Sequence, residues 1–143
     1  MIEMSNVTHL CTTDDPADSL EWHEKLAADK TFPVTVLPAW RPDKAMNVSD
    51  PQAYQQYIKQ LGNVAGINIS SYSQLLQALQ IRHDYFASVG CKVADHGVNV
   101  IPWAETSIEE AENLFLKVLS GNPLSAEECT KLQTAILLEL CRM

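Results

Sequence analysis

The sequence has 143 residues, of which 46% are hydrophobic and 20% charged, and this predicts one globular domain over residues 1–143. Ten Lys and Arg against 18 Asp and Glu give a net charge of -8, which argues against a nucleic-acid partner. No apolar run approaches the roughly 18 residues of a membrane span. The first residues show no signal peptide, so we expect a cytoplasmic protein without a membrane partner.

Three short apolar segments are predicted to be strands, at about residues 7–12, 34–37 and 91–94. They resemble strands that are buried on both faces of a parallel sheet.

Helices are predicted between and after these strands, each with a recognisable start. The first is expected to begin at Asp15-Pro16, and the second begins at Asp50-Pro51 and ends at Gly62. A third helix is predicted over 71–89. The last two begin with capping-box patterns, which are Ser107 with Glu110 and Ser125 with Glu128.

About three strands and five helices in this order predict an α/β fold of right-handed parallel βα units. Three strands are too few for a closed barrel, which needs about 250 residues. The sequence therefore predicts either a small open sheet or a segment of a larger parallel barrel.

Each predicted strand runs into a polar cluster, and active sites of parallel α/β folds lie at the carboxyl ends of strands. The clusters are Thr12-Thr13-Asp14-Asp15-Pro16, Trp40-Arg41-Pro42-Asp43-Lys44 and Asp95-His96-Gly97.

Every cluster also has a structural interpretation. Asp14 and Asp15 either cap a helix or belong to a site. Arg41 either forms a surface salt bridge or binds a carboxylate through its planar guanidinium. Asp95 and His96 either form a structural hydrogen-bonded pair or act in general acid/base chemistry.

Metal and cofactor signals are weak in this chain. Four cysteines, without a C-x-x-C pair, are expected to be reduced and mostly buried. His9-x-Cys11 does not match a structural zinc pattern, and His23 and His83 fit ordinary positions on amphipathic helices. No phosphate-binding loop or nucleophile elbow is found, so we expect no metal ligand and no cofactor in this chain.

Taken together, long motifs in this sequence resemble uronate isomerases (glucuronate isomerases) of the amidohydrolase superfamily, in an internal portion of that family. The matching stretches are Cys-Thr-Thr-Asp-Asp-Pro-Ala-Asp-Ser-Leu at 11–20, Val-Leu-Pro-Ala-Trp-Arg-Pro-Asp-Lys at 36–44, Arg-His-Asp-Tyr-Phe at 82–86 and Gly-Cys-Lys-Val-Ala-Asp-His-Gly at 90–97.

The resemblance implies a segment of a distorted (β/α)8 barrel that interconverts aldose and ketose hexuronates, such as glucuronate and fructuronate. It implies that Arg41 contacts the substrate, with Trp40 and Asp14 also on the substrate-binding side. Asp95 and His96 would be the catalytic pair at a strand end.

The chain departs from the family in its metal site. The family holds a divalent metal, commonly zinc, through a His-x-His pair on the first barrel strand and an Asp after the last, and neither region is found here. Two alternatives to an active isomerase therefore stay open: a truncated, self-associating or binding module, and a small sugar-acid-binding protein that uses Arg41. Open sheet edges and uncovered helix faces lead us to expect a homo-oligomer.

Overall fold

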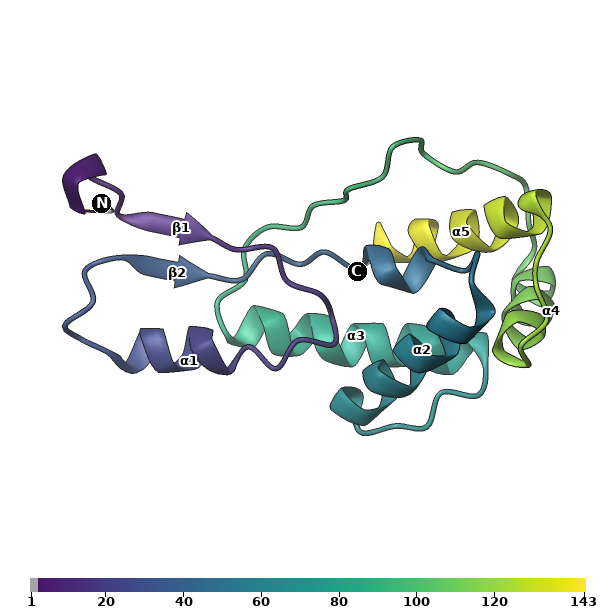
Figure 1. Cartoon of the computed structure of the whole chain (residues 1–143), viewed down its shortest axis with the longest axis horizontal. Coiled ribbons are helices and arrows are strands. Elements are labelled where there is room, and N and C mark those ends of the chain that lie inside the picture. Colours follow the sequence, from purple (N-terminus) through teal and green to yellow (C-terminus); the bar gives the residue numbers. More distant parts are fainter. Residues whose placement is uncertain (1–2) are drawn as a thin grey trace.

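The computed structural model describes residues 3–143 and has the expected α/β class. Figure 1 shows a small sheet with a helix beside it at one end of the molecule and the longer helices toward the other end. The elements in chain order are a 3₁₀ helix Glu3–Ser5, β1 His9–Cys11, α1 Glu21–Ala28, β2 Thr35–Leu37, a 3₁₀ helix Asp43–Met46, α2 Pro51–Ala65, α3 Tyr72–Ser88, α4 Ile108–Leu119 and α5 Ala126–Leu140.

The sheet has two parallel strands, β1 and β2, with Leu10 aligned to Val36 and α1 as the crossover between them. Beyond the strands, single parallel bridges join Asp14 to Trp40 and Trp40 to Ala94. The prediction of a third strand over 91–94 is therefore wrong, although the segment does lie beside the chain that follows β2.

The end of α3 explains why the third segment is so short. Gly90 has a φ of 103°, and the backbone N–H of Cys91 still donates to the carbonyl of Phe86 in the last turn of α3. Only the backbone around Ala94 is therefore free to pair with Trp40, and this single parallel bridge is too short to count as a strand.

The expectation of strands buried on both faces is also wrong. All three residues of β1 are exposed, and Thr35 of β2 is exposed as well. Helix α1 packs against β2, but the described elements leave β1 open to solvent. For the same reason Cys11 is exposed, against the expectation of a buried thiol, and Cys141 is exposed near the other end of the chain; all four cysteines are free.

Helix α1 begins at Glu21, five residues later than predicted from Asp15-Pro16. The intervening residues form turns because the Asp15 carboxylate accepts the N–H of Ala17 and the Asp18 carboxylate accepts the N–H of Leu20. Leu20 then takes a left-handed φ of 57°, which no helix interior allows.

Helix α2 continues through Gly62, the predicted end, and stops at Ala65 before Gly66. Gly66 has a φ of 71° and closes the helix in the left-handed conformation. At Gly62 the requirement is space, since an added Cβ would lie 2.7 Å from the carbonyl oxygen of Ile67.

The other helix starts confirm the predicted cap residues, but of the two predicted capping boxes only Ser125 with Glu128 is complete among the described residues. Asp50, Ser71, Ser107 and Ser125 each accept a backbone N–H of the first turn, and Glu128 completes a capping box with Ser125.

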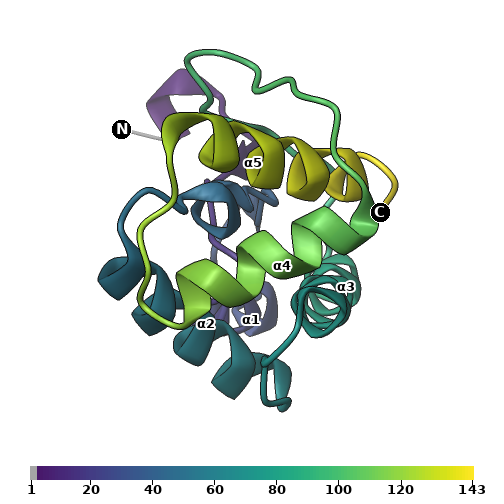
Figure 2. The same cartoon turned by 90° about the vertical axis from the view of Figure 1, so that its right-hand side faces the viewer.

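The hydrophobic core lies among α2, α3, α4 and α5, with α4 crossing in front of α3 in Figure 2. Phe115 of α4 is fully buried and contacts the rings of Tyr54 and Tyr72 edge-on. Within residues 3–143, no helix is long and apolar enough to cross a membrane.

Candidate active site

Three chain segments that are distant in sequence meet just beyond the carboxyl ends of β1 and β2. The N–H of Arg41 donates to the carbonyl of Asp14 at 3.0 Å, and the N–H of Asp95 donates to the carbonyl of Trp40 at 3.0 Å. The three predicted polar clusters are therefore neighbours in the fold, held together by backbone hydrogen bonds.

Arg41 and Asp95 form the central ion pair of this region. The Nε of Arg41 donates to Oδ1 of Asp95 at 3.0 Å, and Nη2 donates to Oδ2 of the same carboxylate. The side chains are 38% and 43% exposed, so the pair lies at the surface. The hydrogen bonds from Arg41 hold the pKa of Asp95 below its ordinary value of 3.8 and raise the pKa of Arg41.

His96 does not pair with Asp95, which corrects the structural interpretation of these two residues as a hydrogen-bonded couple. Its Nδ1 lies 2.8 Å from Oδ1 of Asp43, and Oδ2 of Asp43 accepts the N–H of Gly97 at 2.6 Å. Asp43 was not among the predicted site residues. Its position two residues after Arg41, in the same polar cluster, was the signal available in the sequence.

Trp40 and Asp14 lie beneath this surface. The Trp40 indole is only 3% exposed and makes edge contacts with His83 and Phe86 at centroid distances of 5.4 Å and 5.0 Å. The buried Asp14 carboxylate accepts the N–H of Ala39 at 3.1 Å and so ties the end of β1 to the end of β2. A substrate contact for either residue stays a prediction.

A second buried polar group supports Asp14 from below. The Thr12 hydroxyl donates to the Asp14 carboxylate at 2.6 Å and lies 2.7 Å from Nε2 of His23. Because the Thr12 proton points to Asp14, His23 must supply the proton of the other contact from Nε2. His23 of α1 is thus buried and bonded, which its position on an amphipathic helix did not predict.

Asp15 does not cap a helix, since its carboxylate accepts the N–H of Ala17 in a turn ahead of α1. Lys44 forms a surface ion pair, which was the structural interpretation of its cluster. Burial raises the pKa of Asp15 above 3.8, against the opposing effects of the Ala17 N–H and of Lys44. The Nζ of Lys44 is 3.8 Å from the Asp15 carboxylate on a side chain that is 66% exposed, which is a weak surface ion pair.

The described residues do not fit a zinc ion. Among residues 3–143, no three His, Cys, Asp or Glu side chains converge as a metal site would require.

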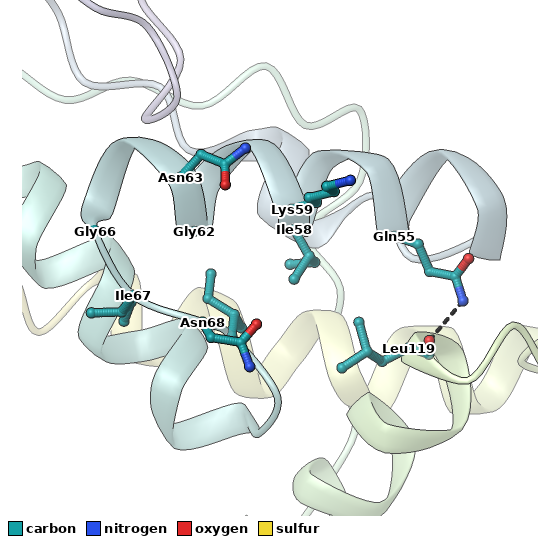
Figure 3. Close-up of a pocket in the computed structure, with 10 residues that line it drawn as sticks. Gln55, Ile58, Lys59, Gly62, Asn63, Gly66, Ile67, Asn68 and Leu119 are labelled. Carbon is teal, nitrogen blue, oxygen red and sulfur yellow. Dashed lines mark hydrogen bonds between the residues drawn. The ribbon is translucent and has the colours of Figure 1, made fainter.

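A separate hollow of about 480 Å³ lies on the far side of α2, between that helix, the 66–69 loop and the end of α4 (Figure 3). Gln55 crosses one side of it by donating to the carbonyl of Leu119 at 2.7 Å. Lys59, Asn63 and Asn68 face it, but none of the predicted site residues does.

Comparison with known proteins decides the family. The family model for glucuronate isomerase matches residues 1–143. The chain belongs to the glucuronate isomerase family. The uronate isomerase of Lachnospira eligens is 49% identical over 140 residues, and that of Cellvibrio japonicus is 42% identical over 139 residues.

Solved structures of glucuronate isomerase relatives share the fold of the chain. The uronate isomerase of Thermotoga maritima superposes with a TM-score of 0.91 at 31% identity, over 99% of this chain and 31% of that one. The glucuronate isomerase of Caulobacter crescentus gives 0.87 at 25% identity, over 99% of this chain and 29% of that one. The chain spans 30% of the length of both sequence relatives.

Proposed function

We propose that this chain supplies the carboxylate-binding and proton-transfer part of a uronate isomerase, which interconverts aldose and ketose hexuronates within a parallel (β/α) barrel. The observation that carries the proposal is the Arg41–Asp95 pair at the strand ends, with His96 next to it in sequence and held at the same surface. Family membership over the whole chain supports the substrate class.

Arg41 is set up to bind a carboxylate while it remains bound to Asp95. A guanidinium has five N–H donors, and Asp95 uses one on Nε and one on Nη2. The other edge, formed by Nη1 and the second proton of Nη2, can hold a second carboxylate in the same planar fork. Asp95 thus orients Arg41, and the free edge is the proposed contact for the C6 carboxylate of a hexuronate.

Proton transfer between neighbouring carbons needs a base beside the bound sugar acid. His96 is a described side chain at this surface with the right chemistry, since an imidazole nitrogen can accept and return a proton. Asp95 is ionised and paired with Arg41, so its role here is to orient Arg41 and not to transfer the proton. A divalent metal, if the complete isomerase holds one as the resemblance implies, would polarise the carbonyl group from ligands outside the described residues.

A chimera tests the proposal directly. This chain would replace the matching 140-residue segment of the Lachnospira eligens uronate isomerase, and isomerisation of glucuronate and galacturonate would be measured with added zinc. Arg41→Ala should lower kcat/KM on the order of 100-fold, because a bidentate charged contact is lost. Lys44→Ala, three residues away at an exposed position, is the matched control and should change it little. A folded chimera without activity would refute the proposal.

A second candidate is a self-associating module. Apolar side chains of the 98–108 segment, which crosses the top of the molecule in Figure 1, stand in solvent: Val100 is 81% exposed, Ile101 71%, Trp103 70% and Ile108 79%. Such a cluster, together with the open β1, invites association with a second copy of the chain.

Light scattering of the purified chain distinguishes this candidate. We expect a homo-oligomer at micromolar concentration, and Trp103→Ser should shift it toward the monomer. The matched control is Trp22→Ser, on a side chain that is also exposed, at 67%, but lies on α1. A wild-type chain that stays monomeric would exclude this function.

A further inference from the structure

The two ring nitrogens of His96 have different surroundings. Nδ1 is 2.8 Å from Oδ1 of Asp43, while Nε2 has no hydrogen-bond partner among residues 3–143. The side chains of both residues are 26% exposed, so the pair is partly open to solvent.

The carboxylate of Asp43 is itself held in place. Its second oxygen accepts the N–H of Gly97 at 2.6 Å, so one carboxylate binds the side chain of His96 and the backbone of the next residue. Asp43 starts the 3₁₀ helix Asp43–Met46, which packs against α5. That helix is anchored by the Tyr54 hydroxyl, which donates to the carbonyl of Ala45, and by Gln133, which donates to the carbonyl of Met46.

Gly97 provides the space for this contact. An added Cβ there would lie 3.3 Å from Oδ2 of Asp43 and 3.7 Å from Nη1 of Arg41. The φ of Gly97 is not left-handed, so the glycine serves the close approach of these two charged groups and not a turn.

From this geometry we propose that Asp43 is a positioning residue for the isomerase reaction, a role that rests on the proposed function. An ionised Asp43 accepts the proton of Nδ1 and so keeps the lone pair of neutral His96 on Nε2. Nε2 takes the proton of C2 as that C–H bond breaks and delivers it to C1 as the new C–H bond forms, while the proton of the O2 hydroxyl passes to O1. Asp43 stabilises the imidazolium in between, and the isomerisation gains and loses no atom.

The tautomer of His96 is the decisive readout, and it needs only this chain. In ¹⁵N-labelled protein at about pH 8, where an ordinary imidazole is neutral, we expect NMR to show His96 protonated at Nδ1. Asp43→Ala should move the population toward Nε2–H, and Asp43→Asn, which keeps one acceptor oxygen, should move it less. The control Asp84→Asn removes a carboxylate 3.6 Å from Nδ1 of His83 and should leave the His96 signal unchanged. The same His96 tautomer in wild type and Asp43→Ala overturns the proposal.

Kinetics of the chimera test the role in the reaction. Asp43→Ala should lower kcat on the order of 10-fold to 100-fold with little change in KM, since general base catalysis is worth roughly 100-fold or more. Asp43→Asn should recover part of the loss. An equal rise in KM with unchanged kcat would overturn the positioning role. If the wild-type chimera is inactive, the proposed function fails, and the tautomer experiment still decides whether Asp43 orients His96.

Discussion

Arg82 of α3 offers a quantitative test of how the loop beneath the site is held. Its side chain is buried, with Nε donating to the carbonyl of Pro16 at 2.8 Å and Nη2 donating to the carbonyl of Asp18 at 2.7 Å. A hydrogen bond from a charged donor contributes roughly 1.5–3 kcal/mol. Pro16 is buried and Asp18 exposed, so only the Pro16 carbonyl is left without water when Arg82 is removed. Arg82→Met should therefore cost about 3 kcal/mol of unfolding free energy.

Urea unfolding measures this value, with the m-value checked for constancy. Arg82→Lys keeps the charge but replaces the two donor groups of the guanidinium with one ammonium group. It should therefore lower the unfolding free energy by about half as much as Arg82→Met. Lys59→Met, at an exposed position on α2, is the control for loss of a cation and should change stability by less than about 0.5 kcal/mol. A loss below about 1 kcal/mol for Arg82→Met would show that these two bonds do not hold the 15–20 turns.

Two further predictions concern single positions near the site. The raised pKa of Asp15 means that the folded chain binds this proton more tightly than the unfolded chain, so its stabilising effect is present in acid and lost as pH rises through the raised pKa. Asp15→Asn should therefore raise the urea midpoint at about pH 7 and raise it less at about pH 3, and an equal rise at both would contradict this. Gly97→Ala should shift the His96 tautomer by displacing Asp43 while changing the unfolding free energy by less than about 1 kcal/mol; an unaltered tautomer would show that Asp43 has room to adjust.

The elements that the sequence predicted well are those with both a cap and a long apolar stripe. Helix α3 begins after Ser71 as expected, because a serine cap and a 17-residue amphipathic helix agree. The start of α1 was missed because Asp15 and Asp18 form local side-chain turns, which compete with a helix for the same capping residues. The 91–94 segment was wrongly predicted to be a strand because its apolar composition does not show that the N–H of Cys91 is already bonded to the last turn of α3.

In the site, the sequence predicted which clusters would meet but not how their charges would pair. The alternation of strands and helices brings Arg41, Asp95 and His96 to one edge, and this follows from parallel topology alone. The partners depend on side-chain directions over separations of more than 50 residues, as between Asp43 and His96. The long motif resemblance also could not show that Trp40 points into the core.

The charge balance of the site predicts how tightly this chain alone binds the proposed hexuronate substrate. The charge of Arg41 is already balanced by Asp95, so a uronate carboxylate can bind only to the free edge of the guanidinium. The net charge of -8 on the whole chain also repels this anion. We therefore expect calorimetry to give a Kd for glucuronate of about 1 mM or weaker, and weaker still for Arg41→Ala. In the chimera, where the proposed barrel would enclose the same edge, affinity should increase at least tenfold. Micromolar binding by the isolated chain would show instead that its own residues complete a site, and would favour a sugar-acid-binding protein over a part of an isomerase.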